Sequence, residues 1–311
     1  EWLDNLRFRK EILEALEENC ITEEEYVSIN TKYPVGFYTP NIFIRLGLFI
    51  LTLIILLFSF GLLLLISSTN LDSGLGRLAI FFAVLCFVAL ELMINKKHYC
   101  SGVDDGLLWS GAFALLCGIC MPYNFTELTI CIIVFVISLL ACVRYADILM
   151  TTVAYFSMLG IVFYCCMEMG HYAKTVVPFV IMAISLLIYF IARHTKVKNH
   201  TIYYKDCLQT IEVVALLSLY AAGNYYVVRE LSNEMFNMLL QPGESIPFGW
   251  IFWILTILIP VIYLVRGVQK KDTILLRIGL LLFAAIVFTV RYYHTILPIE
   301  TMMTIGGIIL L

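Results

Sequence analysis

Hydrophobic residues are grouped along this chain in long runs that are separated by short polar segments. Most runs approach the ~20 residues that an α-helix needs to cross the ~30 Å of hydrocarbon in a bilayer. We therefore predict an all-α fold, a polytopic transmembrane helical bundle of about ten helices. The predicted helices lie near residues 42–67, 77–95, 106–122, 127–143, 147–168, 174–192, 207–228, 247–265, 273–290 and 297–311.

Three features qualify this pattern. The tenth run, residues 297–311, stops inside an apolar stretch, so we expect the native chain to continue beyond Leu311. Pro178 and Pro260 fall inside predicted helices, where proline favours a kink. The segment Ser232–Pro247 mixes apolar and polar residues in a pattern typical of a segment that lies on the outer membrane interface.

The first 41 residues are more polar and predict a separate cytosolic amphipathic helical hairpin, which precedes a transmembrane domain at residues 42–311. Its first helix has an apolar stripe on one face, formed by Trp2, Leu6, Leu13 and Leu16. Thr22 followed three residues later by Glu25 predicts a capping box at the start of its second helix. The hairpin is either a surface helix pair or a docking platform for a protein partner at residues 1–40.

Composition agrees with a membrane protein. The chain is 61% hydrophobic and 14% charged, whereas a soluble domain is about half apolar and about a quarter charged. The net charge of −3 argues against a nucleic-acid partner. We expect membrane lipids as partners and no cofactor, since no phosphate loop, nucleotide fingerprint or catalytic serine motif is present.

The distribution of Lys and Arg predicts the orientation. If the N-terminus is cytoplasmic, the inside segments hold 15 of the 20 Lys and Arg residues and the outside segments hold 4, with Arg277 remaining. This bias follows the positive-inside rule. We therefore predict a multi-pass protein of the bacterial inner membrane with a cytoplasmic N-terminus.

Two short stretches resemble each other. Phe43-Ile-Arg45-Leu-Gly47-Leu opens the first apolar run and Leu275-Leu-Arg277-Ile-Gly279-Leu opens the ninth. Both runs enter from the predicted cytosolic side, so the pattern indicates a parallel repeat of the kind found in transporters. The alternative is a pair of unrelated basic anchors at the membrane surface.

The hairpin with its Ile21-Thr22-Glu-Glu cap, the Arg277-Ile-Gly279 segment and the Arg291-Tyr-Tyr segment together resemble an uncharacterised family of bacterial membrane proteins of unknown function. The resemblance implies a bacterial inner-membrane setting and no known activity. It carries over no functional residues.

Ionisable residues inside the apolar runs are candidate functional residues, because charge at membrane depth is costly and commonly faces a bundle interior or a water-filled cavity. Glu212 and Arg277 lie at equal depth on two helices that enter from the same side, so we expect them to form an ion pair that borders a functional path. The alternatives are a purely structural pair, or an arginine that extends to the cytosol.

A second set of candidates lies near the predicted outer face: Arg291, His294, Glu300, Glu168 and His171. Together they suggest a polar vestibule or a proton relay. Tyrosines beside them are also typical of an interfacial belt, and a histidine in a loop is typically solvated. No spacing of metal ligands supports a metal site.

Cys117-Gly-Ile-Cys120 has the spacing of a redox motif and lies near the predicted outer face. Thiol chemistry needs an accessible thiolate with a low pKa, and no Lys, Arg or His adjoins this motif. Packing as small apolar residues is the alternative. We accordingly expect both cysteines to be dispensable.

These observations lead to one leading function and two alternatives. We expect transport or ion-coupled sensing through a polar path near the seventh, ninth and tenth apolar runs. The first alternative is a non-catalytic membrane subunit or scaffold that recruits a partner through residues 1–40. The second is a membrane thiol oxidoreductase.

Overall fold

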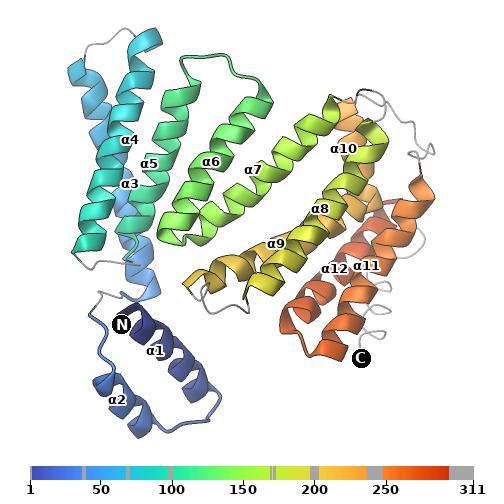
Figure 1. Cartoon of the computed structure of the whole chain (residues 1–311), viewed down its shortest axis with the longest axis horizontal. Helices are drawn as coiled ribbons and strands as arrows, with labels where there is room; N and C mark the ends of the chain where they lie inside the picture. Colours follow the sequence, from blue (N-terminus) through green and yellow to red (C-terminus); the bar gives the residue numbers. More distant parts are fainter. Residues whose placement is uncertain are drawn as a thin grey trace. The chain divides into compact units, whose positions relative to one another are not determined.

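The computed structural model describes residues 2–36, 40–67, 71–96, 101–168, 170, 173–196, 203–236 and 248–293. These residues form helices and their connections, with no strand among them (Figure 1). Nine helices in this part of the chain are long and apolar enough to cross a membrane. The predicted class, a polytopic transmembrane helical bundle, is therefore confirmed. The helices form two compact units, residues 1–125 and 126–311, which are described separately.

Unit 1 begins with a helical hairpin, α1 (Trp2–Glu17) and α2 (Glu23–Lys32). The predicted capping box is present, because Glu25 N donates to Thr22 Oγ1 and Thr22 N donates to the Glu25 carboxylate. The pKa of the Glu25 carboxyl is lowered, first because the Thr22 backbone N–H donates to it and second because the Thr22 hydroxyl does. Arg9 also donates to the Asn30 side chain, which ties α1 to α2.

The membrane-spanning part of unit 1 comprises α3 (Ile42–Ser67), α4 (Leu71–Asn95) and α5 (Val103–Cys120). Two glycines allow the close approach of backbones in this unit. A Cβ on Gly118 would lie 2.6 Å from Ile80 Cγ1 and 2.9 Å from the Gly76 carbonyl oxygen, so α4 and α5 cross in tight contact. Gly102 has φ +91° and faces the Arg45 carbonyl oxygen, so a side chain there would be excluded.

Unit 2 comprises α6 (Glu127–Tyr145), α7 (Ile148–Met167), α8 (Ala173–Lys196), α9 (Lys205–Gly223), α10 (Tyr225–Phe236), α11 (Gly249–Lys270) and α12 (Thr273–Tyr293). The pairs α6–α7, α8–α9 and α11–α12 pack as neighbours along the chain, and α9 also contacts α7, α11 and α12. Helix α9 is therefore the central helix of the unit. The largest core cluster surrounds it, with Ala215, Leu216, Leu219 and Tyr220 from α9 itself.

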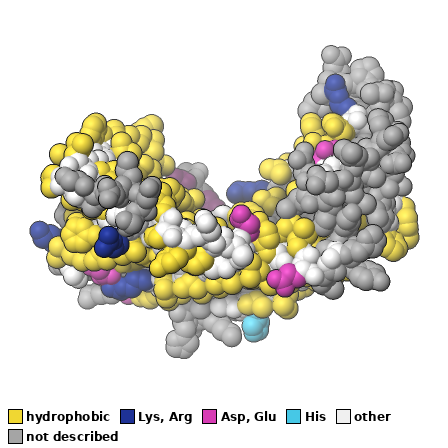
Figure 2. All heavy atoms as spheres, turned by 90° about the horizontal axis from the view of Figure 1, so that it is seen from above, with side chains coloured by type: hydrophobic (Ala, Val, Ile, Leu, Met, Phe, Trp, Pro, Cys, Tyr) yellow, Lys and Arg dark blue, Asp and Glu magenta, His cyan; other side chains and the backbone are white. Residues whose placement is uncertain are grey.

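The outward faces of the spanning helices are apolar. Figure 2 shows hydrophobic side chains over much of the described surface on one face of the molecule. On α3, for example, Phe43, Leu57 and Leu65 are exposed to 73% or more. A surface of this kind is unfavourable in water and favourable against the acyl chains of a bilayer, so the membrane-spanning helices contact lipid.

The structure corrects the seventh predicted helix and its following segment. The apolar run 207–228 is not one helix, because α9 ends at Gly223 and α10 begins at Tyr225, with Asn224 between them in extended conformation. Residues 232–236 belong to α10 and not to a loop. The predicted tenth helix at residues 297–311 lies outside the described residues.

The two stretches that resemble each other in sequence have different surroundings. A Cβ on Gly47 in α3 would meet nothing within 4 Å, whereas a Cβ on Gly279 in α12 would lie 3.0 Å from Leu264 of α11. Gly279 therefore serves helix packing and Gly47 does not. The parallel repeat stays a prediction.

Candidate functional site

A buried ion pair lies between α8 and α9. Lys196 Nζ donates to Glu212 Oε2 at 3.0 Å, and the side chains are 20% and 6% exposed. Glu212 is seven residues past Lys205, the first residue of α9, which places it ~10 Å along the helix. Lys196 is the last residue of α8, so its chain reaches back from the membrane boundary to neutralise the carboxylate. An acid at this depth without a cation would be strongly destabilising.

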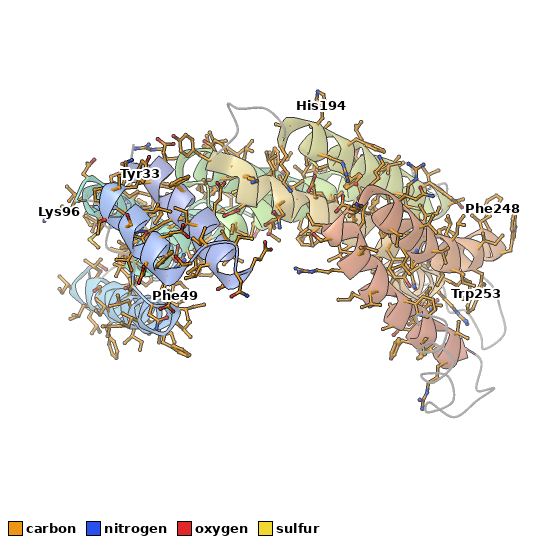
Figure 3. All side chains as sticks on the ribbon, turned by 90° about the horizontal axis from the view of Figure 1, so that it is seen from below. Tyr33, Phe49, Lys96, His194, Phe248 and Trp253 are labelled. Atoms are coloured by element: carbon orange, nitrogen blue, oxygen red, sulfur yellow. The ribbon has the colours of Figure 1, made fainter. Side chains whose placement is uncertain are left out.

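A second ion pair lies one turn away on α8. Arg193 Nη1 donates to Asp272 Oδ2 at 2.7 Å and to the Tyr189 hydroxyl. Asp272 directly precedes α12, and its other oxygen accepts from the N–H groups of Ile274 and Leu275. This carboxylate therefore caps α12 and anchors it to α8. His194 takes no part, since Figure 3 shows it pointing away from the neighbouring helices.

These groups form what we call the ion-pair cluster, defined as Tyr189, Arg193, Lys196, Glu212 and Asp272. The C-terminal end of α8, the first turns of α9 and the start of α12 bring them together at one end of unit 2. Two cations and two carboxylates balance in charge. A charge-balanced cluster in which one carboxylate is deeply buried can respond to a proton or a small cation, because either competes with lysine for the acid.

Helix α9 carries polar groups from this cluster toward the opposite end of the unit. Glu212, Leu216, Tyr220 and Asn224 are spaced four residues apart, so they lie along one face of the helix and its extension. All four are buried. The Leu216 carbonyl accepts from the Tyr263 hydroxyl at 3.1 Å, which places a phenol on this row between the acid and Tyr220.

The row ends at the break between α9 and α10. Asn224 is 2% exposed, and its Nδ2 donates to the Tyr220 hydroxyl at 2.8 Å and to Thr289 Oγ1 at 3.1 Å. Its Oδ1 accepts from the N–H groups of Tyr226 and Val227 and so caps α10. Thr256 Oγ1 accepts from Tyr225 N at 3.0 Å. Side chains of α11 and α12 thereby satisfy groups that the broken helix leaves unpaired, as a broken membrane helix requires.

The expected pair between Glu212 and Arg277 is wrong. Glu212 is paired with Lys196, and Arg277 is exposed and makes no ion pair with any described residue. The buried face of α12 is formed by Leu275, Ile278 and Leu282, and Arg277 lies off that face. Equal depth did not bring the two charges together, because depth along a helix does not determine the direction in which a side chain points.

The other predicted site residues are not gathered into the ion-pair cluster. Glu168 is exposed at the C-terminal end of α7, and Arg291 is exposed in the last turn of α12. Neither makes an ion pair with a residue that the structure describes. His171, His294 and Glu300 lie outside the described residues. The outer vestibule therefore stays a prediction.

Unit 1 has a polar junction of its own between α3 and α5. Arg45 donates to Asp105 Oδ2 through Nη2 at 2.6 Å and Nε at 3.0 Å. Asp104 Oδ1 accepts from the N–H groups of Ser101 and Gly102 and from the Ser101 hydroxyl. These bonds hold the start of α5 against α3, so we assign them a structural role.

The cysteines show one association that the sequence pattern did not suggest. Cys142 Sγ lies 3.0 Å from Thr151 Oγ1, and Cys207 Sγ donates to the Ala146 carbonyl at 3.1 Å, so the start of α9 is tied to the turn between α6 and α7. Cys117 and Cys120 are partly exposed free thiols at the end of α5, and Gly118 between them closes the contact with α4. Within the described residues no three His, Cys, Asp or Glu side chains are grouped to hold a metal ion.

The nine apolar helices and the buried polar groups define an integral multi-pass membrane protein. The chain matches no family model, no curated protein and no solved structure. The resemblance to an uncharacterised bacterial membrane family stays a prediction.

Proposed function

We propose that the protein is a transport protein in which Glu212 gains and loses a proton or a small cation while Lys196 alternately binds and releases the carboxylate. The observation that carries the proposal is the ion pair itself, which joins a carboxylate side chain only 6% exposed to a lysine at the end of α8. Charged residues within membrane helices are typical of ion pathways and proton relays.

The exchange has a simple electrostatic basis. When Glu212 is ionised, Lys196 neutralises it at 3.0 Å. When a proton or a cation occupies the carboxylate, the attraction is lost, and Lys196, which is 20% exposed, extends toward water at the membrane boundary. The pair thus has two arrangements that differ in the position of one lysine side chain, which is the kind of two-state element that coupling requires.

The discontinuous helix supports the same proposal. Broken helices in transporters leave backbone groups at membrane depth that can contact a solute or ion. Asn224 lies 12 residues past Glu212, ~18 Å farther along the helix axis, and buried Tyr220 lies between them. The row of polar groups on α9 therefore spans most of the distance that a solute or proton would have to cross.

The proposal is tested by reconstituting the purified protein into liposomes that contain a pH-sensitive dye and driving proton entry with a potassium diffusion potential. We expect the wild type to acidify the lumen at least tenfold faster than empty liposomes, and Glu212→Gln to return the rate to that of empty liposomes. The matched control is Asp206→Asn, an exposed acid in the first turn of the same helix. A wild-type rate equal to that of empty liposomes, or an unchanged rate in Glu212→Gln, contradicts the proposal.

We place this activity in the bacterial inner membrane, with the N-terminus and the ion-pair cluster on the cytoplasmic side. The support is the excess of Lys and Arg in the segments at that end of the helices. Cys20 is an exposed native thiol in the hairpin and serves as the reporter. In a variant that keeps no other cysteine, a membrane-impermeant maleimide should label Cys20 only after the cells are permeabilised.

A second candidate function is partner recruitment through residues 1–40. The observation that favours it is the apolar surface of the hairpin, where Phe8, Leu13 and Val27 are all exposed by 42% or more. Co-purification from native membranes with and without residues 1–40 tests it. A partner that is retained equally by both forms rules the hairpin out as the recruiting element.

A further inference from the structure

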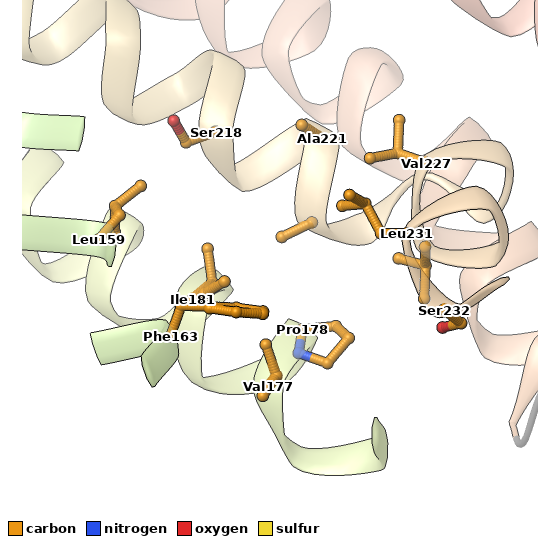
Figure 4. A pocket seen from close by; sticks show the side chains of 12 residues that line it. Leu159, Phe163, Val177, Pro178, Ile181, Ser218, Ala221, Val227, Leu231 and Ser232 are labelled. Carbon is orange, nitrogen blue, oxygen red and sulfur yellow. The ribbon is translucent and has the colours of Figure 1, made fainter. Parts of the chain in front are cut away.

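An apolar pocket of about 200 Å³ lies in unit 2 among α7, α8, α9 and α10 (Figure 4). Two irregularities of the chain create the space. Pro178 lies within α8 and has no N–H to donate to the preceding turn. On the opposite wall, α9 gives way to α10 at Asn224, so Ala222 and Leu231 come from two different helices.

The walls determine the chemistry of the ligand. Among the residues that the structure describes, no charged residue lines the pocket, and the only polar side chains in its lining are those of Ser218 and Ser232. These two serines lie toward opposite ends of the pocket in Figure 4, with apolar side chains between them. A cavity with such walls holds water poorly and accepts apolar matter. The pocket therefore fits a hydrocarbon chain with a hydrogen-bonding group at one end.

The position of the pocket identifies the source of that chain. Cys207 at the start of α9 donates to Ala146 beside the start of α7, so the two helices begin at the same end of the unit. Phe163 and Ala222 lie 15 and 17 residues from those starts, ~22–26 Å away. The pocket thus lies in the half of the membrane opposite the ion-pair cluster, and its opening continues into the apolar outer surface through Leu231, which is 52% exposed.

The polar end of the pocket lies on α10. Ser232 is buried, and its side chain lines the pocket. The Oδ1 atom of the next residue, Asn233, is buried without a hydrogen-bond partner in the described part of the chain. Buried polar atoms without partners are rare in folded proteins, so we expect the polar group of a ligand at this end of the pocket. Ester carbonyls of a phospholipid accept from a serine hydroxyl.

We propose that this pocket binds one acyl chain of a bilayer phospholipid, with Ser232 donating to the ester region of the same lipid. The inference does not depend on transport. It assigns α7–α10 a lipid site in the leaflet opposite the ion-pair cluster. The lipid fills the space beside the break in α9, so its binding stabilises the arrangement of α8, α9 and α10.

The test uses the full-length protein in phospholipid vesicles that contain a phosphatidylethanolamine with a photoreactive diazirine in its acyl chain. After illumination, we expect labelled peptides from α7 and α8 around Phe163 and Pro178. Ala222→Leu fills the pocket and should reduce this labelling at least fivefold. Ala284→Leu, the same change at an exposed position of α12, should leave it unaltered. Equal labelling in wild type and Ala222→Leu overturns the proposal.

A second variant tests the polar contact and stays informative if Ala222→Leu does not fold. The wild type should prefer a diester probe to a diether probe, which lacks the ester carbonyl, by at least threefold. Ser232→Ala keeps the apolar walls and should abolish that preference. An equal preference in both proteins, or labelling by a free fatty-acid probe and not by the phospholipid probe, contradicts the assignment.

Discussion

Because Glu212 is more deeply buried than Lys196, replacing Lys196 should destabilise the protein more than replacing Glu212. Replacing either residue by methionine keeps an unbranched side chain of similar length and removes its charge. At 3.0 Å and an effective dielectric constant of about 20, the direct attraction is about 5 kcal/mol before desolvation is subtracted. Lys196→Met leaves the carboxylate of Glu212, 6% exposed, without a cation. The cost of such an uncompensated buried charge is about 3–5 kcal/mol.

The reverse substitution should be milder. Glu212→Met leaves Lys196, which is 20% exposed and at the end of α8, free to turn to water, so we expect a loss of about 1 kcal/mol, in the range of exposed pairs. The double variant replaces the pair by two apolar side chains and should lie within about 1 kcal/mol of the wild type. The coupling free energy between the two positions is then at least about 2 kcal/mol.

The free energy of unfolding can be measured by titrating the protein in mixed micelles with SDS and following far-UV circular dichroism and tryptophan fluorescence. Glu17→Gln, an exposed acid at the end of α1, serves as a control and should change stability by less than about 0.5 kcal/mol. If the free-energy changes of the two methionine substitutions simply add, or if Glu212→Met costs more than Lys196→Met, then Lys196 does not stabilise the buried carboxylate of Glu212.

Three further predictions concern local structure. Asn224→Ala removes the cap of α10 and leaves buried hydroxyls without their donor, so it should destabilise the protein by about 2–4 kcal/mol in the same titration; a loss below about 0.5 kcal/mol would contradict this role. Gly102→Ala places a Cβ in steric conflict with the Arg45 carbonyl oxygen at φ +91° and should cost about 1–3 kcal/mol. Gly47→Ala, whose Cβ would meet nothing within 4 Å, should stabilise α3 by about 0.5–1 kcal/mol. Because the folded protein lowers the pKa of Glu25 from 4.5, the capping box stabilises α2 at neutral pH and should lose this contribution as the pH falls through that lowered pKa. The hydrogen-exchange protection factors of the α2 amides, which remove the intrinsic pH dependence of exchange, should fall there in the wild type and show no such step in Glu25→Gln.

Local features of the chain were predictable and distant pairings were not. The capping box of Thr22 and Glu25 follows from residues three apart, and the spanning helices follow from the length of their apolar runs. The pairing of Arg45 with Asp105 and of Arg193 with Asp272 depends on which helices become neighbours, and hydropathy contains no such information. The break at Asn224 was detectable, since Gly223-Asn224 is a common turn signal, but the surrounding apolar run masked it.

The predicted pair between Glu212 and Arg277 was wrong for a specific physical reason. The number of residues from the start of each helix places Arg277 at the same depth as Glu212, and arginine commonly pairs with a carboxylate. Helix α8 runs antiparallel to α9 and ends beside the start of α9, so its last residue, Lys196, lies next to Glu212. The cation that neutralises Glu212 therefore comes from the adjacent helix and not from α12. The same hairpin geometry explains why the observed site includes Arg193 and Tyr189 of α8, which the sequence pattern did not indicate.

The central claim is that Glu212 changes its protonation while Lys196 binds and releases its carboxylate, and infrared difference spectroscopy of the reconstituted protein tests it most directly. Perfusing the membranes alternately with buffers of low and high proton concentration should produce a carbonyl stretch of a protonated, buried carboxyl group. We expect this band in the wild type and in Asp206→Asn, its absence in Glu212→Gln, and an altered frequency in Lys196→Met, because the lysine lies 3.0 Å from the carboxylate. A spectrum without the band in the wild type, or with the same band in Glu212→Gln, would contradict the account.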